Sequence, residues 1–186
     1  MLNPFLDKFI YTSTLKYTHN NFYLAEVPFV LVPTDLLIGI CGEEKADFDK
    51  MIYYSTKKSV LKRMLKQFDL HFGIQGEKFL YLLDDFFTAS GWGEIKIINI
   101  DKKNSKALIA VSSSPIATAL KGKVKNPVDH MLRAVFSAMF THYFKTPVEC
   151  VENKCFAKGD KDCEFVVKKV SEFNFSNKIT RRQLKI

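Results

Sequence analysis

The chain has 186 residues, a formal net charge of +8 and a hydrophobic content of 47%, with 17 Phe and 7 Tyr. Its length favours one domain, and so many apolar residues exclude an intrinsically disordered chain. No apolar run approaches the roughly 18 residues that a membrane-spanning helix needs, and the first residues lack the pattern of a secretory signal. We therefore expect a cytoplasmic protein with a packed core.

The positive charge is spread along the chain, because the Lys residues are scattered among Asp and Glu. This distribution favours a solvated surface over a nucleic-acid partner. The densest basic cluster is 178–185, which contains Arg181 and Arg182. We expect residues 173–186 to form a basic C-terminal tail that is frayed or weakly docked; contact with a phosphate backbone is the alternative.

The N-terminal part of the chain predicts an extended segment. Residues 22–33 are rich in β-branched and aromatic side chains, and Pro28 and Pro33 predict an irregularity and an end to that segment. Residues 35–40 fit either a helix or a buried strand.

The middle of the chain predicts two helices and a hairpin. Apolar residues recur every three or four positions over residues 46–68, which predicts an amphipathic helix. A second helix is expected over 77–88, with Gly91 well placed to end it. Two β-rich segments, 94–100 and 106–112, flank a polar turn and predict a hairpin.

The C-terminal part predicts one more helix and one more hairpin. Asn126 is a suitable N-cap and Pro127 a suitable first residue for a helix that continues to Phe144. Segments 148–156 and 163–170 then flank a turn. Strands and helices are grouped along the chain, so the pattern favours an α+β fold over a doubly wound parallel sheet.

The four cysteines, Cys41, Cys150, Cys155 and Cys163, do not have the density of a disulfide scaffold. Gly159 lies midway between Cys155 and Cys163 and is the residue best suited to turn the chain. With Gly159 at the tip, the two cysteines face each other with Cβ atoms about 4.5–5.5 Å apart, which allows two thiolates to bind one ion. The alternative is a disulfide or a pair of inert core thiols.

A tetrahedral site needs further ligands. Glu152 can add a carboxylate oxygen, but a regular strand would direct it to the face opposite Cys155, so a bend or bulge is required between them. Asp129 and His130, on the first turn of the preceding helix, are candidates for the fourth ligand. Cys150 is a local alternative, although its position favours a buried strand residue.

The run from Glu152 to Phe165 resembles the C-terminal signature of the vinyl-4-reductase domain family, with an acid, Cys, Gly-Asp, Cys and an aromatic residue at these spacings. Two upstream stretches resemble the family as well. They are residues 90–95, followed by two strands, and Pro127-Val128 at the start of the helix before residues 146–149. The similarity extends in the same order over most of the chain.

The resemblance implies an α+β fold in which an antiparallel sheet packs against helices, related to subunits of the TRAPP tethering complex and to nitric-oxide sensor domains. In its sensor branch, the matching acid and two cysteines bind zinc together with a cysteine just after Pro-Val. The resemblance therefore implies that Glu152, Cys155 and Cys163 bind a structural Zn²⁺. The fourth position falls on Asp129 instead of a cysteine, so Asp129, His130 or water completes the site.

The family also implies an apolar cavity for a ligand near the hairpin. Trp92 matches a ligand-contacting position in relatives that sense aromatic compounds, and its ring can line a cavity while its indole N–H orients the ligand. A Trp that simply fills the core is the alternative. Four phenylalanines on the helices are further candidates for the cavity wall: Phe86, Phe87, Phe136 and Phe140.

We expect a zinc-stapled domain that binds a hydrophobic or aromatic ligand as a sensor or carrier. Residues 46–172 form the vinyl-4-reductase-like part, and residues 1–45 add the first strand and helix elements to the same domain. A sensor needs a signalling partner chain, and the family's behaviour implies a homodimer. The alternatives are a reductase subunit acting on a vinyl or tetrapyrrole substrate and a TRAPP-like scaffold. The chain shows no dinucleotide fingerprint, so catalytic activity is not expected.

Overall fold

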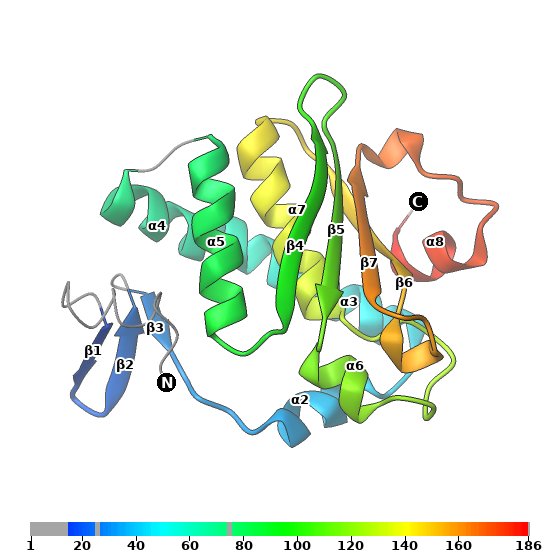
Figure 1. Ribbon diagram of the computed structural model, residues 1–186, viewed down its shortest axis with the longest axis horizontal. Coiled ribbons are helices and arrows are strands. Elements are labelled where there is room, and N and C mark those ends of the chain that lie inside the picture. Colours follow the sequence, from blue (N-terminus) through cyan, green and yellow to red (C-terminus); the bar gives the residue numbers. More distant parts are fainter. Residues whose placement is uncertain (1–14, 25–26, 74–75, 186) are drawn as a thin grey trace.

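The computed structural model describes residues 15–24, 27–73 and 76–185. Its centre is a four-stranded antiparallel sheet in the order β4-β5-β7-β6 (Figure 1). The strands are β4 (Glu94–Asp101), β5 (Lys106–Ser112), β6 (Glu149–Lys154) and β7 (Cys163–Lys168). Both predicted hairpins are present, and they meet where β5 pairs with β7.

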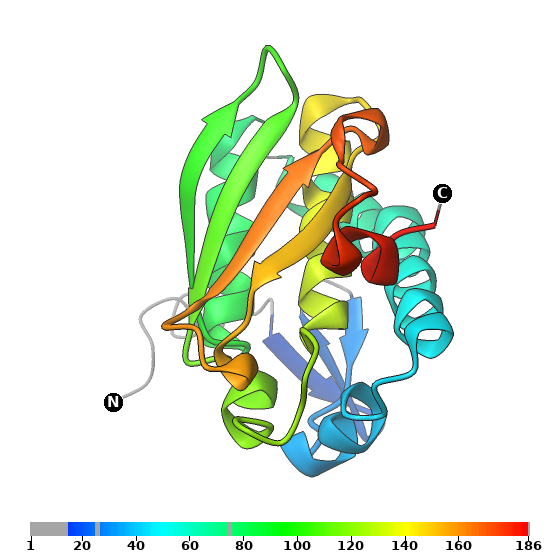
Figure 2. The ribbon, with the colours of Figure 1, turned by 90° about the vertical axis from the view of Figure 1, so that its right-hand side faces the viewer.

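Helices cover one face of this sheet, as the side view in Figure 2 shows. Helices α5 (Glu77–Ala89) and α7 (His130–Phe144) pack against the strands, and α3 (Ala46–Ser59) packs against α7. Alternate residues of β5 are buried, because every second side chain of a strand points to the same face. The predicted α+β class is confirmed. In the described ranges no helix is long and apolar enough to cross a membrane.

The amphipathic pattern over residues 46–68 forms a continuous helical path. It consists of α3, the π-helical segment η1 (Val60–Met64) and α4 (Leu65–Phe72). Ile52 and Phe68 are buried on its apolar face. The predicted helix is therefore present and continues one turn further than expected.

The segment 22–33 is not one extended run, and this expectation was wrong. It contributes to a separate three-stranded antiparallel sheet made of β1 (Leu15–Thr18), β2 (Asn21–Leu24) and β3 (Val27–Phe29). Pro28 pairs with Tyr23 in the edge strand β3, where a residue without a backbone N–H is tolerated. The ambiguous segment after it is a helix, α2 (Thr34–Cys41).

Helix α7 begins at His130, so the predicted start at Asn126 and Pro127 was wrong. The side-chain amide and the backbone N–H of Asn126 both donate to the carboxylate of Glu44, which lies far away in sequence. Asp129 is the N-cap residue, but its side chain caps no backbone N–H. A long-range hydrogen bond therefore replaces the local cap that the sequence predicts.

Two short α-helices and two single 3-10 turns complete the described fold: α6 (Pro115–Ala119), α8 (Lys178–Gln183), η2 (Phe156–Lys158) and η3 (Val170–Glu172). Helix α8 packs against β6 and α3 (Figure 1). Gln183 and Leu184 are buried. The expected frayed tail was therefore wrong, because specific polar and apolar contacts hold this segment.

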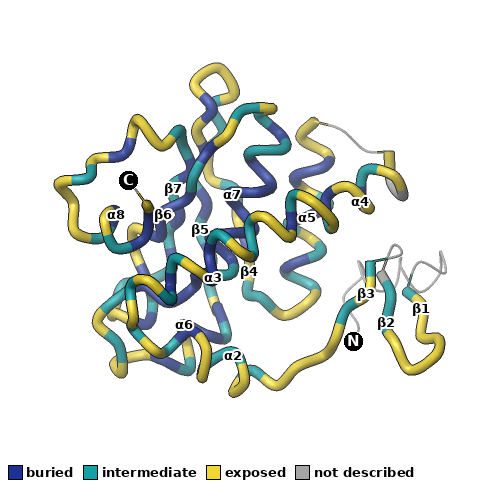
Figure 3. The backbone as a smooth tube through the Cα atoms, turned by 180° about the vertical axis from the view of Figure 1, so that it is seen from behind, coloured by how far each residue is buried: buried dark blue, intermediate teal, exposed yellow. Residues whose placement is uncertain are grey.

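The core lies between the sheet and the helices, and α7 is buried over most of its length (Figure 3). One cation lies within this core. Arg133 is 0% exposed, its guanidinium carbon lies 4.0 Å from the centre of the Tyr53 ring, and its Nη1 donates to the carbonyl of Gln183 at 2.8 Å. In the described chain, its Nε and Nη2 have no hydrogen-bond partner. A buried cation with spare donors is costly unless negative charge lies nearby.

Candidate metal centre and ligand cavity

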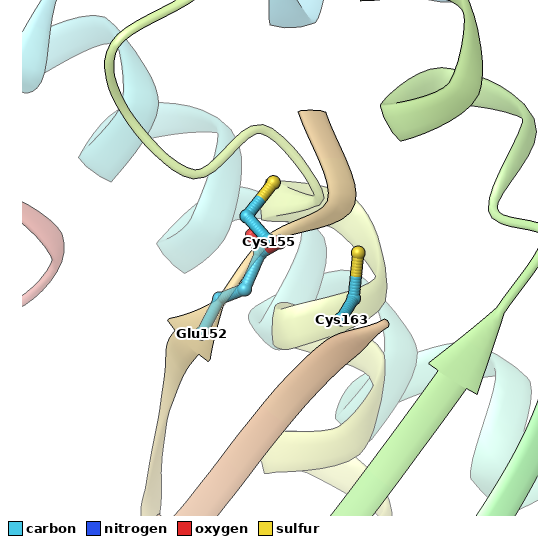
Figure 4. Close-up of side chains that lie close together, drawn as sticks. All are labelled: Glu152, Cys155 and Cys163. Carbon is cyan, nitrogen blue, oxygen red and sulfur yellow. The ribbon is translucent and has the colours of Figure 1, made fainter. Parts of the chain in front are cut away.

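Glu152, Cys155 and Cys163 lie together at one end of the sheet (Figure 4). A carboxylate oxygen and the two Sγ atoms all lie within 4.8 Å of one another, and each of the three residues is 0% exposed. Glu152 is on β6, Cys155 follows that strand and Cys163 opens β7. A carboxylate and two thiols at this spacing are suited to holding a metal ion.

A β-bulge brings Glu152 and Cys155 to the same side. The pairing of β6 with β7 shifts between Glu152, which lies opposite Phe165, and Lys154, which lies opposite Glu164. The extra residue changes the alternation of side chains, so Glu152 no longer points away from Cys155. The bend that the metal hypothesis requires is therefore present at this position.

The turn between the two cysteines directs backbone groups at the site. Gly159 has a φ of 101°, a left-handed conformation that suits glycine, and η2 precedes it. The N–H of Cys155 donates to the Asp160 carboxylate at 2.8 Å, and the N–H of Phe156 donates to Cys163 Sγ at 3.3 Å. The first bond fixes the turn, and the second is of the kind that orients a metal ligand from its outer shell.

Asp129 reaches the group from the start of α7. Its Oδ2 accepts a hydrogen bond from Cys163 Sγ at 3.3 Å, and its Oδ1 accepts one from Ser114 at 2.8 Å. Its backbone N–H donates to Glu152 at 3.0 Å. The neighbouring His130 turns away, with Nε2 3.3 Å from the buried carboxylate of Asp49. Of the two candidates for the fourth ligand, Asp129 is the one in contact with the group.

The acids of this group have no ion-pair partner among the described residues. Burial raises the pKa of Glu152 well above its ordinary value and raises that of Asp129 to about 6. The interaction with the Cys163 side chain lowers the pKa of Cys155 to about 7, whereas the interaction with Cys155 and then burial raise the pKa of Cys163. No Lys or Arg of the described residues forms an ion pair with Glu152 or Asp129.

The fit of a metal ion can be judged from these donors. Glu152 Oε1 is buried and has no hydrogen-bond partner in the described part of the chain. A bound cation would satisfy that oxygen and would balance the buried acids, since a buried charge is stable only when it is paired. The residues present therefore fit a metal ion.

The other two cysteines lie outside the group. Cys150 is 0% exposed on β6, where it pairs with Val167, and Cys41 is buried at the end of α2. All four cysteines are free thiols in the structure.

A cavity of about 570 Å³ lies beside Trp92, where the sequence predicts a ligand site. Trp92, Phe86 and Phe87 form one wall, at the end of α5 and in the loop that leads to β4. The rest of the lining includes residues of the N-terminal sheet and of the segment after it: Leu15, Phe22, Phe29, Val30 and Leu31. The lining is mostly apolar, as in small-molecule sites.

Phe136 and Phe140 do not line this cavity. They are 1% and 0% exposed on α7, and the ring of Phe136 makes an edge contact with Phe165 at 5.0 Å. The structure thus brings together three of the five predicted ligand-binding residues and places the other two in the core. The N-terminal part of the lining was missed, because nothing in the sequence indicates that Leu15, Phe22 and Phe29 line the same cavity as Trp92.

Comparison with known proteins gives a family match over part of the chain. Residues 109–169 match the profile of the vinyl-4-reductase domain, the family that the motifs resemble. This range runs from β5 to the end of β7 and contains Asp129, Glu152, Cys155 and Cys163. The predicted resemblance is confirmed. A search of curated protein sequences found no significant match.

Solved structures with a similar fold include the phenol-responsive sensory domain of the transcription activator PoxR with phenol. It is 13% identical, with a TM-score of 0.69 over 98% of this chain and 97% of that one, and the two chains therefore share a fold. A vinyl-4-reductase family protein from Methanocaldococcus jannaschii is 15% identical, with a TM-score of 0.47 over 76% and 84% of the two chains. A trafficking protein particle complex subunit 3 from Naegleria fowleri, covalently bound to palmitic acid, is 16% identical, with a TM-score of 0.46 over 73% and 93%.

Proposed function

We propose that this protein is a small-molecule-binding domain that acts as a sensor or carrier of a hydrophobic or aromatic ligand, with a structural zinc ion in its fold. The observation that carries the proposal is the buried group of Glu152, Cys155 and Cys163 inside the segment that matches the vinyl-4-reductase domain. A cavity with an apolar lining in the same molecule supports the binding of a hydrophobic ligand.

Zinc is the ion that best suits these donors. Thiolates favour Zn²⁺ over Mg²⁺ or Ca²⁺, and four protein ligands without an open position are typical of structural zinc sites. Glu152, Cys155 and Cys163 would hold the ion, and the carboxylate of Asp129, in contact with Cys163, would be the fourth ligand. When bound, the ion supplies a cross-link between β6, β7 and the start of α7. The buried Arg133, close enough to Glu152 to interact electrostatically, offsets part of the negative charge.

The ligand would lie against Trp92. The cavity volume of about 570 Å³ is within the range typical of small-molecule sites, about 300–1,000 Å³. The Phe86 and Phe87 rings are in edge contact at 5.1 Å, and Phe87 contacts Trp92 in the same manner at 6.1 Å. Such an aromatic wall favours a flat apolar ligand. The fold shared with the PoxR domain, whose structure contains phenol, supports a phenol-like compound as the first candidate.

A sensor must pass its signal on, so this proposal includes a separate signalling partner. We also propose that the protein forms a homodimer. The alternatives are a reductase subunit and a TRAPP-like scaffold with the same fold. A reductase would need an electron donor, and a scaffold would need no exchangeable ligand.

Elemental analysis of the protein purified without chelator tests the metal. We expect about one zinc per chain, and its loss in the double variant Cys155→Ser, Cys163→Ser. Cys41→Ala is the matched control, because Cys41 is also a buried thiol but lies outside the group. Retention of zinc by the double variant, or a native protein without zinc, would contradict the proposal.

Native mass spectrometry tests the ligand. A co-purified small molecule, or binding of added phenol, supports a sensor or carrier. A bare dimer that binds none of a panel of aromatic and acyl compounds would favour a scaffold. Turnover of a vinyl substrate with a supplied electron donor would favour the reductase.

A further inference from the structure

The C-terminal helix α8 contacts the backbone of a candidate metal ligand. The side-chain amide of Gln183 makes two hydrogen bonds with Glu152: Oε1 accepts from the Glu152 N–H and Nε2 donates to the Glu152 carbonyl, each at 2.8 Å. β6 is an edge strand, so these two groups have no strand partner on that side. Gln183 therefore takes the place of a neighbouring strand at this one residue.

This contact lies at the bulge that shapes the metal group. The pairing of β6 shifts directly after Glu152, and the shift is what brings Glu152 to the side of Cys155. Bulged residues lose regular pairing and need other contacts to fix their conformation. Gln183, which is 1% exposed, supplies them.

Two further contacts connect α8 to the start of α7. Arg133 donates to the Gln183 carbonyl at 2.8 Å. Arg182 pairs with the buried carboxylate of Asp49 at 2.7 Å, and the other oxygen of Asp49 lies 3.3 Å from His130. His130 adjoins Asp129, so α8 is connected to two of the elements that carry candidate ligands, β6 and the start of α7.

We propose that Gln183 is a positioning residue for the metal ligand Glu152, and that docking of α8 and occupancy of the metal site stabilise each other. This inference rests on the metal site of the proposed function. Gln183 holds the backbone from which Glu152 extends, so an undocked α8 leaves that ligand poorly oriented. By thermodynamic reciprocity, an ion that fixes Glu152 also favours the docked helix. Metal loss would then release residues 178–185 and uncover the edge of β6.

Zinc affinity measured by competition with a chelator tests the first half. Outer-shell substitutions weaken metal binding about 10–100-fold, and we expect Gln183→Ala to fall in that range. Gln183→Glu keeps the acceptor for the Glu152 N–H, but it places a second, negatively charged oxygen against the Glu152 carbonyl, so its affinity should fall at least as far as that of Gln183→Ala. Gln67→Ala is the matched control, because Gln67 is exposed on α4, and it should leave affinity unchanged.

Hydrogen exchange of the wild-type protein tests the second half without a variant. Removal of zinc should speed exchange of the amides in 178–185 by about 10-fold or more, while amides in the middle of α5 change little. Wild-type zinc affinity in Gln183→Ala, or unchanged exchange in 178–185, would overturn the inference. A wild-type protein that holds no zinc would instead overturn the proposed function, so the two failures are distinguishable.

Discussion

The carboxylate of Asp129 accepts a hydrogen bond from the thiol of Cys163, with Oδ2 and Sγ 3.3 Å apart. The two residues are separated by 34 positions in sequence. The contact joins the start of α7 to the start of β7, and it brings a second carboxyl group to Glu152, Cys155 and Cys163.

Asp129→Asn should weaken zinc binding by at least about 10-fold, because the amide carries no negative charge and is a poor zinc ligand. His130→Gln is the control: the His130 ring contacts Asp49, so this change should leave zinc affinity within about 2-fold of the wild type. Chelator competition measures both. A larger loss for His130→Gln than for Asp129→Asn would assign the fourth position to the histidine.

In the zinc-free protein, the stability contributed by Asp129 and Glu152 should fall as the pH rises from about 4 to 7. Burial raises the pKa of Asp129 from 3.8 to about 6 and also raises that of Glu152. A carboxyl group whose pKa is higher in the folded state than in the unfolded state contributes stability that is fully present below its unfolded-state pKa. This stability is lost as the pH rises through its folded-state pKa. Zinc requires deprotonated ligands, so the stabilisation by added zinc should grow over the same range.

Urea unfolding at several pH values, with and without chelator, measures this dependence. The variant Asp129→Asn has no carboxyl at that position, so the difference in unfolding free energy between it and the zinc-free wild type should change with pH. A constant difference between pH 4 and 7 would show that Asp129 does not titrate in this range.

Trp92 is the one tryptophan of the chain, so its fluorescence reports on the cavity directly. Added phenol should change that fluorescence in a saturable way. Trp92→Phe keeps an aromatic wall but removes the indole N–H, and the loss of one hydrogen bond, about 1 kcal/mol, should weaken binding about 5-fold by calorimetry. Tyr81→Phe, on the exposed side of α5, should bind as the wild type does. Equal affinities of Trp92→Phe and the wild type for phenol would show that the indole N–H forms no hydrogen bond with the ligand.

Gly93→Ala should destabilise the protein by about 1–3 kcal/mol. Gly93 has a φ of 108°, and an added Cβ would lie 2.7 Å from the carbonyl oxygen of Ser112 and 3.0 Å from a methyl carbon of Val111. Gly39→Ala is the control, because its Cβ would meet nothing within 4 Å in helix α2, where alanine is favoured by up to about 1 kcal/mol. Urea midpoints compare the two, and equal midpoints would contradict the close approach.

Much of the fold could be predicted from the sequence, because amphipathic periodicity is a local property. The helix that starts at Ala46, the helix that starts at Glu77 and both hairpins follow from it. The predicted start of α7 failed because Asn126 bonds to Glu44 instead of capping the helix. A residue type that favours a local helix cap thus binds a carboxylate 82 positions away in sequence.

The candidate metal group also combines features that could be predicted from the sequence with features that could not. The spacing of Glu152, Cys155 and Cys163 can be read along the chain, since all three lie within one turn and its flanking strands. Three features required the folded structure: the bulge that turns Glu152 toward the thiols, the contact of Asp129 with Cys163, and the hydrogen bonds of Gln183 at the edge of β6. The two kinds of feature differ in distance along the chain, because side-chain alternation acts between neighbours, whereas these contacts form only once separate elements have packed.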